Sequence, residues 1–165
     1  MRFDAEPGLD GQMRTWETRT TVPGSPSAVL ELLTEPDAIA RWAPVPFEVV
    51  SLDHRRLRTG SRARIAGSLA GRAVEFDVNV LEASGERLVL TADGPISLDV
   101  RYALRPVRGG SDVRASVSVE GCGLFGRLLA KATEALLAAG ALRSALEVMS
   151  RQLQRGAGTA VALTA

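Results

Sequence analysis

The chain of 165 residues has very few of the side chains on which metal, disulfide and acid–base chemistry depend. Cys122 is its only cysteine and His54 its only histidine. A single cysteine excludes an intramolecular disulfide and is typical of proteins in a reducing compartment. One histidine and one cysteine cannot supply three metal ligands without a carboxylate cluster, and the sequence shows no such cluster. We therefore expect no metal site and no cofactor.

Charge of one sign and long apolar runs are also scarce. The net charge is +1 and the arginines are spread along the chain, with Lys131 as the only lysine, so no basic block indicates a nucleic-acid partner. No apolar run reaches the roughly 18 residues of a membrane-spanning helix. Residues 1–11 contain no continuous apolar core of the kind found in signal peptides. These absences predict a cytoplasmic protein without a membrane span, and the length predicts one domain.

One long helix is predicted over residues 123–155, because this stretch has no proline and its apolar residues recur every three or four positions. Its predicted apolar face includes Leu128, Ala132 and Leu136. Residues 132–141 of this face are mostly small, and Gly140 interrupts the helix at a cost of about 1 kcal/mol relative to alanine. Close packing against a sheet would explain the small residues, and so would space left for a bound molecule.

Seven strands are predicted from alternating apolar and polar residues, over 15–22, 45–52, 62–69, 73–83, 87–92, 96–107 and 112–120. The alternation is clearest where Val74, Phe76 and Val78 oppose Glu75 and Asp77, which indicates one buried and one wet face. Two short helices, over 28–33 and 37–42, follow the first strand, with Ser25 as the cap and Pro26 in the first turn. Short turns between the later strands predict antiparallel neighbours.

This order predicts an α+β fold in which a curved antiparallel sheet of about seven strands wraps around the long C-terminal helix. Residues 14–155 form the predicted domain. Residues 1–13 lack periodicity and are predicted to be a flexible leader, and residues 156–165 a flexible tail.

Two segments resemble the START-like, or SRPBCC, superfamily, which includes plant pathogenesis-related allergens, lipid-transfer domains and polyketide cyclases. They are SPSAVLELLTEPDAIARWAP at residues 25–44 and GLFGRLL at residues 123–129. The resemblance covers roughly residues 15–155 and implies a helix-grip fold with a deep cavity between sheet and helix. These motifs specify the fold much better than an activity, since members of the superfamily range from carriers to enzymes.

The resemblance makes the residues that alternate toward the predicted cavity the informative ones. Tyr102 is the best polar candidate for contacting a ligand, although a core tyrosine bonded to the backbone explains it equally well. His54 is better explained as a solvated loop residue than as a catalytic base, and no catalytic residue is assigned. The residues predicted to contact a ligand, nearly all of them apolar, are Trp16, Thr18, Trp42, Phe47, Ile65, Phe76, Val78, Leu90, Leu98, Val100, Tyr102, Val117, Leu128, Ala132 and Leu136.

Three functions fit this pattern. The favoured one is binding or carriage of a hydrophobic small molecule, such as a lipid, a polyketide or an aromatic metabolite, because the inward face is apolar. The second is an enzyme of the polyketide cyclase, aromatase or dehydrase type, which would rely mainly on substrate shape and orientation. The third is a protein-interaction module that uses the outer face of the sheet or an exposed edge, with a homodimer as one possibility.

Overall fold

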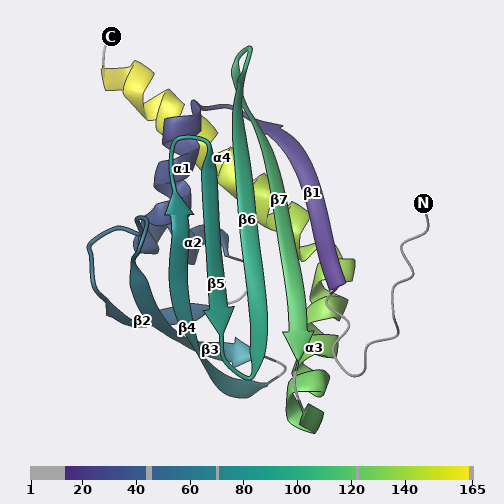
Figure 1. Ribbon diagram of the computed structural model, residues 1–165. Coiled ribbons are helices and arrows are strands. Elements are labelled where there is room, and N and C mark those ends of the chain that lie inside the picture. The colour runs from purple at the N-terminus through teal and green to yellow at the C-terminus, as the bar shows by residue number, and fades with distance from the viewer. Residues whose placement is uncertain (1–13, 44–45, 70, 122, 164–165) are drawn as a thin grey trace, which may run out of the picture.

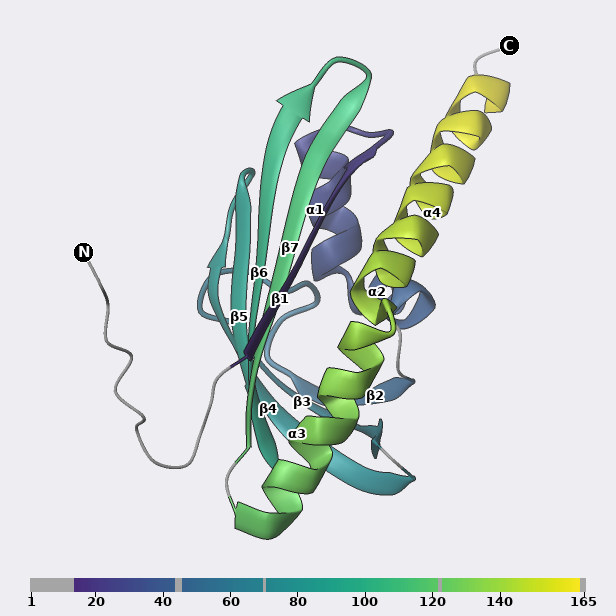
Figure 2. The ribbon, with the colours of Figure 1, turned by 90° about the vertical axis from the view of Figure 1, so that its right-hand side faces the viewer.

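An open, curved antiparallel sheet forms the body of the molecule, and helices cover its concave face (Figures 1 and 2). The computed structural model describes residues 14–43, 46–69, 71–121 and 123–163, with side chains up to residue 156. The elements in chain order are β1 (Arg14–Val22), α1 (Pro26–Thr34), α2 (Pro36–Trp42), β2 (Phe47–Leu52), β3 (Arg62–Leu69), β4 (Arg72–Ala83), β5 (Arg87–Asp93), β6 (Ile96–Val107), β7 (Gly110–Gly121), α3 (Gly123–Ala138) and α4 (Ala141–Leu163). The predicted α+β helix-grip arrangement is confirmed.

The seven strands of the described chain lie in the order β1-β7-β6-β5-β4-β3-β2, and all neighbours are antiparallel. From β2 to β7 each strand pairs with the next, as the short turns predict. β1 pairs with β7, so that Trp16 lies opposite Val117. Register shifts in β2, between Val49 and Ser51, and in β4, between Val80 and Glu82, mark bulges. Bulges bend strands, which contributes to the curvature that makes one face concave.

The C-terminal helix differs from the prediction in two ways. It is divided at Gly140, whose φ of 95° ends α3 and is readily adopted only by glycine. The prediction of one continuous helix over 123–155 is therefore corrected to two helices. The second, α4, continues to Leu163, so its backbone is helical where the sequence predicts a flexible tail from residue 156. The predicted leader, residues 1–13, and Cys122 lie outside the described residues.

A well-packed core lies between the helices and the concave face of the sheet. It joins Val29 and Leu33 of α1, Val113 of β7, and Leu146 and Met149 of α4, all of which are almost fully buried. Ser25 caps α1 as predicted, accepting a hydrogen bond from the Ala28 amide at 3.2 Å. None of the described helices combines the length and the apolar character needed to cross a bilayer.

The contact between α3 and β7 depends on glycine, which gives a first test. A Cβ atom at Gly121 would overlap the backbone of Gly126 and approach the Ala130 side chain to 2.9 Å. We expect Gly121→Ala to lower the free energy of unfolding by about 1–3 kcal/mol, because backbone cannot move aside as a flexible side chain can. Urea unfolding would measure the loss. Gly85→Ala is the control, since no atom lies within 4 Å of the added methyl group, and an equal loss in both variants would contradict the interpretation.

Candidate functional site

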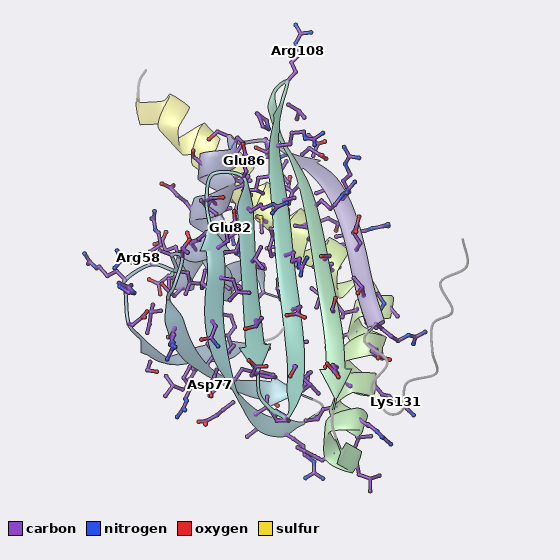
Figure 3. All side chains as sticks on the ribbon, viewed as in Figure 1. Arg58, Asp77, Glu82, Glu86, Arg108 and Lys131 are labelled. Atoms are coloured by element: carbon purple, nitrogen blue, oxygen red, sulfur yellow. The ribbon has the colours of Figure 1, made fainter. Side chains whose placement is uncertain are left out.

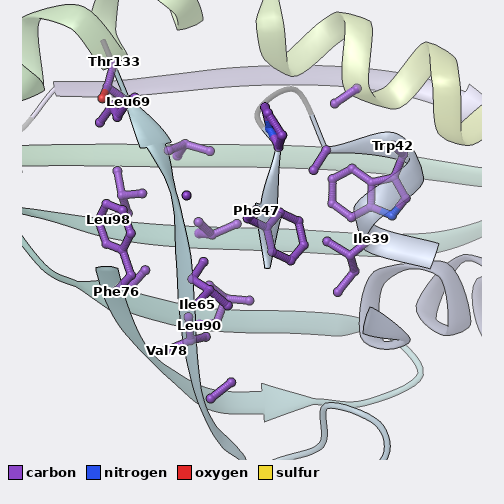
Figure 4. Close-up of a pocket in the computed structure, with 18 of the residues that line it drawn as sticks. Ile39, Trp42, Phe47, Ile65, Leu69, Phe76, Val78, Leu90, Leu98 and Thr133 are labelled. Carbon is purple, nitrogen blue, oxygen red and sulfur yellow. The ribbon is translucent and has the colours of Figure 1, made fainter. Parts of the chain in front are cut away.

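A cavity of about 370 Å³ also lies between the helices and the concave face, and part of its lining belongs to the core cluster (Figure 4). Strands β2 to β6, together with Val117 of β7, form its floor, and residues from α1 to α4 close it from the other side. It extends between Trp42 and Ile39 at one end and Leu69 and Thr133 at the other. This volume lies within the range of roughly 300–1,000 Å³ that is typical of small-molecule sites.

Cross-strand pairing creates the apolar floor. Ile65 lies opposite Phe76, and Val78 opposite Ala92. The row continues because Leu90 lies opposite Val100. Each of these residues lines the cavity. Because side chains alternate between the faces of a strand, one correct register brings the whole apolar set to the same side.

Helices α1 and α2 are held against this floor by Trp42. Its indole Nε1 donates a hydrogen bond to the Leu32 carbonyl at 2.9 Å, which joins the end of α2 to α1. Its ring meets that of Tyr102 edge to face, with centroids 6.4 Å apart and an interplanar angle of 78°. Trp42 is thus buried in the core cluster and also lines the cavity.

Polar groups are rare in the lining. None of its described side chains carries a formal charge, and its hydroxyls are those of Ser68, Thr133 and Tyr102. The Thr133 hydroxyl donates to the Leu129 carbonyl at 2.9 Å, so its proton is already used. Ser68 is exposed near the end of β3. The third hydroxyl of the described lining belongs to Tyr102, which is a buried residue.

Tyr102 is held in the middle of β6, where Leu88 and Ala115 are its partners on either side. Burial raises the pKa of its phenol above the ordinary value. No hydrogen bond to this hydroxyl is seen among the residues that the structure describes, and burial is the one cause of its raised pKa.

The exposed members of the lining mark the mouth of the cavity. They are Pro46 and Val49 beside or within β2, Ser68 of β3 and Leu136 of α3. Val49 is 41% and Leu136 44% exposed, although both also face the cavity. The mouth therefore lies between the β2–β3 edge of the sheet and α3.

Most residues predicted to contact a ligand come together in this lining. Those that line the cavity are Trp42, Phe47, Ile65, Phe76, Val78, Leu90, Leu98, Val100, Tyr102, Val117 and Leu136.

Four predicted residues lie elsewhere and are corrected here. Trp16 and Thr18 are on β1, the edge strand beside β7, and Trp16 packs against the core cluster instead of lining the cavity. Leu128 is on the exposed side of α3, with Ala132 half-buried, while Leu129 is fully buried. The helical period of α3 was predicted correctly, but the side of the helix predicted to be buried was not, because α3 carries apolar residues on both sides.

Several lining residues were missed. Ile39 could have been found, since it lies three residues before Trp42 on the same helical face. Leu57 could not, because it lies in the irregular segment between β2 and β3. There its amide donates to the Thr34 carbonyl at 2.9 Å, which fixes a buried leucine without any periodic signal.

His54 lies in the same segment, outside the cavity lining, with Nδ1 2.9 Å from the Asp53 carboxylate. No group of three potential metal-ligating side chains occurs within the described residues.

Comparison with known proteins places this cavity in context. Residues 13–155 match the family model of polyketide cyclase / dehydrase and lipid transport proteins. Protein CV1439 from Chromobacterium violaceum has a similar structure, with a TM-score of 0.64 and 20% identity over 84% of this chain and 96% of that one. TTHA0849 from Thermus thermophilus is similar with a TM-score of 0.66 and 19% sequence identity, over 87% of this chain and 99% of that one. Ara h 8.0201 is similar with a TM-score of 0.60 and 12% sequence identity, over 87% of this chain and 99% of that one. No curated protein matches the sequence. At these identities the structural likenesses show the fold alone.

The buried phenol gives a spectroscopic test, because Tyr102 is the only tyrosine in the chain. An exposed tyrosine ionises near pH 10. The raised pKa means that the folded state keeps its proton at a pH at which the unfolded chain loses it. We expect ultraviolet absorbance to show no tyrosinate in the folded protein at about pH 10–11. The contribution of the protonated Tyr102 phenol to the free energy of unfolding is complete below about pH 10. It is lost as the pH rises through the pKa of the phenol in the folded state. A folded-state midpoint near pH 10 would show that water reaches the hydroxyl.

Proposed function

Because the chain belongs to the polyketide cyclase / dehydrase and lipid transport family, we propose that it binds an uncharged, hydrophobic small molecule in the cavity between the sheet and the C-terminal helices. The observation that carries this proposal is the lining, in which apolar side chains surround the available hydroxyl of Tyr102. Such a site holds its ligand by burial and orients it with one hydrogen bond.

The energetics favour a neutral ligand. Burying about 300 Å² of apolar ligand surface would contribute roughly 7 kcal/mol before the entropic costs of association. A formal charge on the ligand would lose several kcal/mol of hydration, which no charged side chain in the described lining offsets. Lipids, polyketides and aromatic metabolites without a buried charge meet this condition.

A cyclase or dehydrase activity is the second candidate, and Tyr102 is the observation that favours it. With its pKa raised by burial, the phenol remains protonated near neutral pH and acts as a donor, not as a general base. Its chemistry would be hydrogen bonding to a carbonyl oxygen of the substrate, which stabilises negative charge that develops there during enolisation. Both candidates therefore use the same contact between Tyr102 and a carbonyl group.

Blocking the cavity tests the first candidate. Val100 and Val107 lie on the same strand, but only Val100 lines the cavity, while Val107 is exposed. We expect Val100→Phe to weaken binding of the neutral fluorescent probe N-phenyl-1-naphthylamine by about tenfold or more, since each added methylene must displace ligand or strain the wall. Filling empty volume should also raise the free energy of unfolding by about 0.5–2 kcal/mol. Val107→Phe is the matched control, and equal binding by wild type and both variants would place the probe elsewhere.

A matched pair of ligands tests the role of Tyr102. Fluorenone and fluorene differ in one carbonyl group, so the ratio of their dissociation constants isolates the hydrogen bond. We expect wild type to prefer fluorenone by about fivefold and Tyr102→Phe to lose that preference, since one hydrogen bond contributes about 0.5–1.5 kcal/mol. Binding of fluorene should be unchanged, because the ring remains. A preference that survives the substitution would remove Tyr102 from the site.

Native mass spectrometry of the purified protein, with analysis of an organic extract, would identify a resident ligand.

A further inference from the structure

The outer side of α3 is apolar and exposed to solvent. Leu124 is 91%, Phe125 45% and Leu128 61% exposed, and Leu136 continues the same side of the helix at 44%. At 1.5 Å per residue this strip, Leu124 to Leu136, is about 18 Å long. Alanines at positions 132 and 135 lie between its large residues. We call it the α3 outer face.

Packing within the described chain does not explain the α3 outer face. Helix α3 already contacts the rest of the protein through its opposite side, where Gly126, Leu129 and Ala130 are buried and Thr133 and Leu137 line the cavity. A helix that is apolar on both sides is normally covered on both. Contiguous exposed apolar side chains on a folded protein mark a surface that meets a partner or a membrane.

Positive charge borders the α3 outer face. Lys131 lies exposed beside Leu128, at the end of the molecule opposite the β6–β7 turn (Figure 3). Arg72, at the start of β4, places its guanidinium carbon 5.6 Å from the centroid of the Phe125 ring. The one acidic residue of α3, Glu134, is directed to Arg14 of β1, with the two charged groups 3.5 Å apart. The exposed apolar strip therefore has cations at its margins and no acidic side chain of α3 available to them.

We propose that the α3 outer face docks on a bilayer that contains anionic phospholipids. Leucine and phenylalanine side chains would enter the boundary between headgroups and acyl chains, while Lys131 and Arg72 stay at the level of the lipid phosphates. A second copy of the chain fits this surface less well. Two such faces related by a twofold axis would bring the cations at their margins, Lys131 and Arg72, toward those of the other copy. Glu134 could not offset this repulsion, because it is already paired with Arg14.

The position of the cavity agrees with this orientation. Leu136 belongs both to the α3 outer face and to the mouth of the cavity. Docking would thus bring the mouth close to the lipid surface, where a hydrophobic ligand could pass between bilayer and protein with little exposure to water. This link with ligand transfer rests on the proposed function, whereas the docking itself does not.

Vesicle sedimentation with the full chain tests the proposal. We expect the wild type to bind vesicles of phosphatidylcholine containing phosphatidylglycerol and to bind pure phosphatidylcholine much more weakly, with binding reduced by added salt. The double variant L124D/L128D should lower the partition coefficient about tenfold or more, because two leucines no longer enter the lipid. Lys131→Glu should lower it about fivefold or more.

Matched controls separate docking from general damage. Leu81→Asp introduces the same change at a leucine that is 57% exposed on β4, away from α3. Arg108→Glu reverses one charge at the opposite end of the molecule (Figure 3). Both controls should bind vesicles as the wild type does. Binding of N-phenyl-1-naphthylamine reports the cavity separately, so loss of vesicle binding with an intact cavity supports docking alone.

Three results would overturn the proposal. The first is equal binding of wild type to neutral and anionic vesicles, or none to either. The second is wild-type vesicle binding by L124D/L128D with its unfolding temperature unchanged. The third is a concentration-dependent dimer in sedimentation velocity that L124D/L128D dissociates, which would assign the α3 outer face to a second copy of this chain.

Discussion

The structure depends on one constraint: an open, curved sheet exposes a concave apolar face that the helices must cover, and they fill it only in part. Where α1 and α4 reach the face, residues such as Val113 and Met149 pack without exposure. Toward β2 and β3 the sheet curves around the helices at a distance, and a volume of about 370 Å³ is left. The core and the cavity share residues such as Leu33, Leu88 and Tyr102, so the same apolar surface both stabilises the fold and lines the cavity.

The polar groups in the cavity lining differ in whether the protein's own backbone satisfies them. Trp42 Nε1 and the Thr133 hydroxyl both donate to backbone carbonyls, which satisfies them without a ligand. Tyr102 differs because its hydroxyl lies on the floor, in the middle of β6, where the backbone is already committed to the sheet. The phenol is therefore the hydroxyl of the lining that the backbone does not engage, and this is why the proposed ligand contact is assigned to it.

The sequence predicted those features that depend on local alternation, and it did so well. The opposition of Phe76 and Val78 to Asp77 assigned both faces of β4, and most of the predicted cavity residues follow from such patterns. It could not show that β1 lies beside β7, because that pairing joins segments about a hundred residues apart and has no turn between them. Leu57 was also out of reach, since a buried residue in an irregular segment has no period. Gly140 was recognised as costly but not as the end of a helix.

The misassigned phase of α3 is informative in its own right. Periodicity locates an apolar face only when the opposite face is polar, and here Leu124 and Leu128 lie on one side while Leu129 and Leu137 lie on the other. The inward set is sufficient to cover the sheet and to close the cavity, so the fold would tolerate polar residues at the outer positions. Exposed leucines give the isolated protein no packing energy and increase its tendency to associate. Packing within the described residues does not explain their presence, and the proposed docking on a bilayer does.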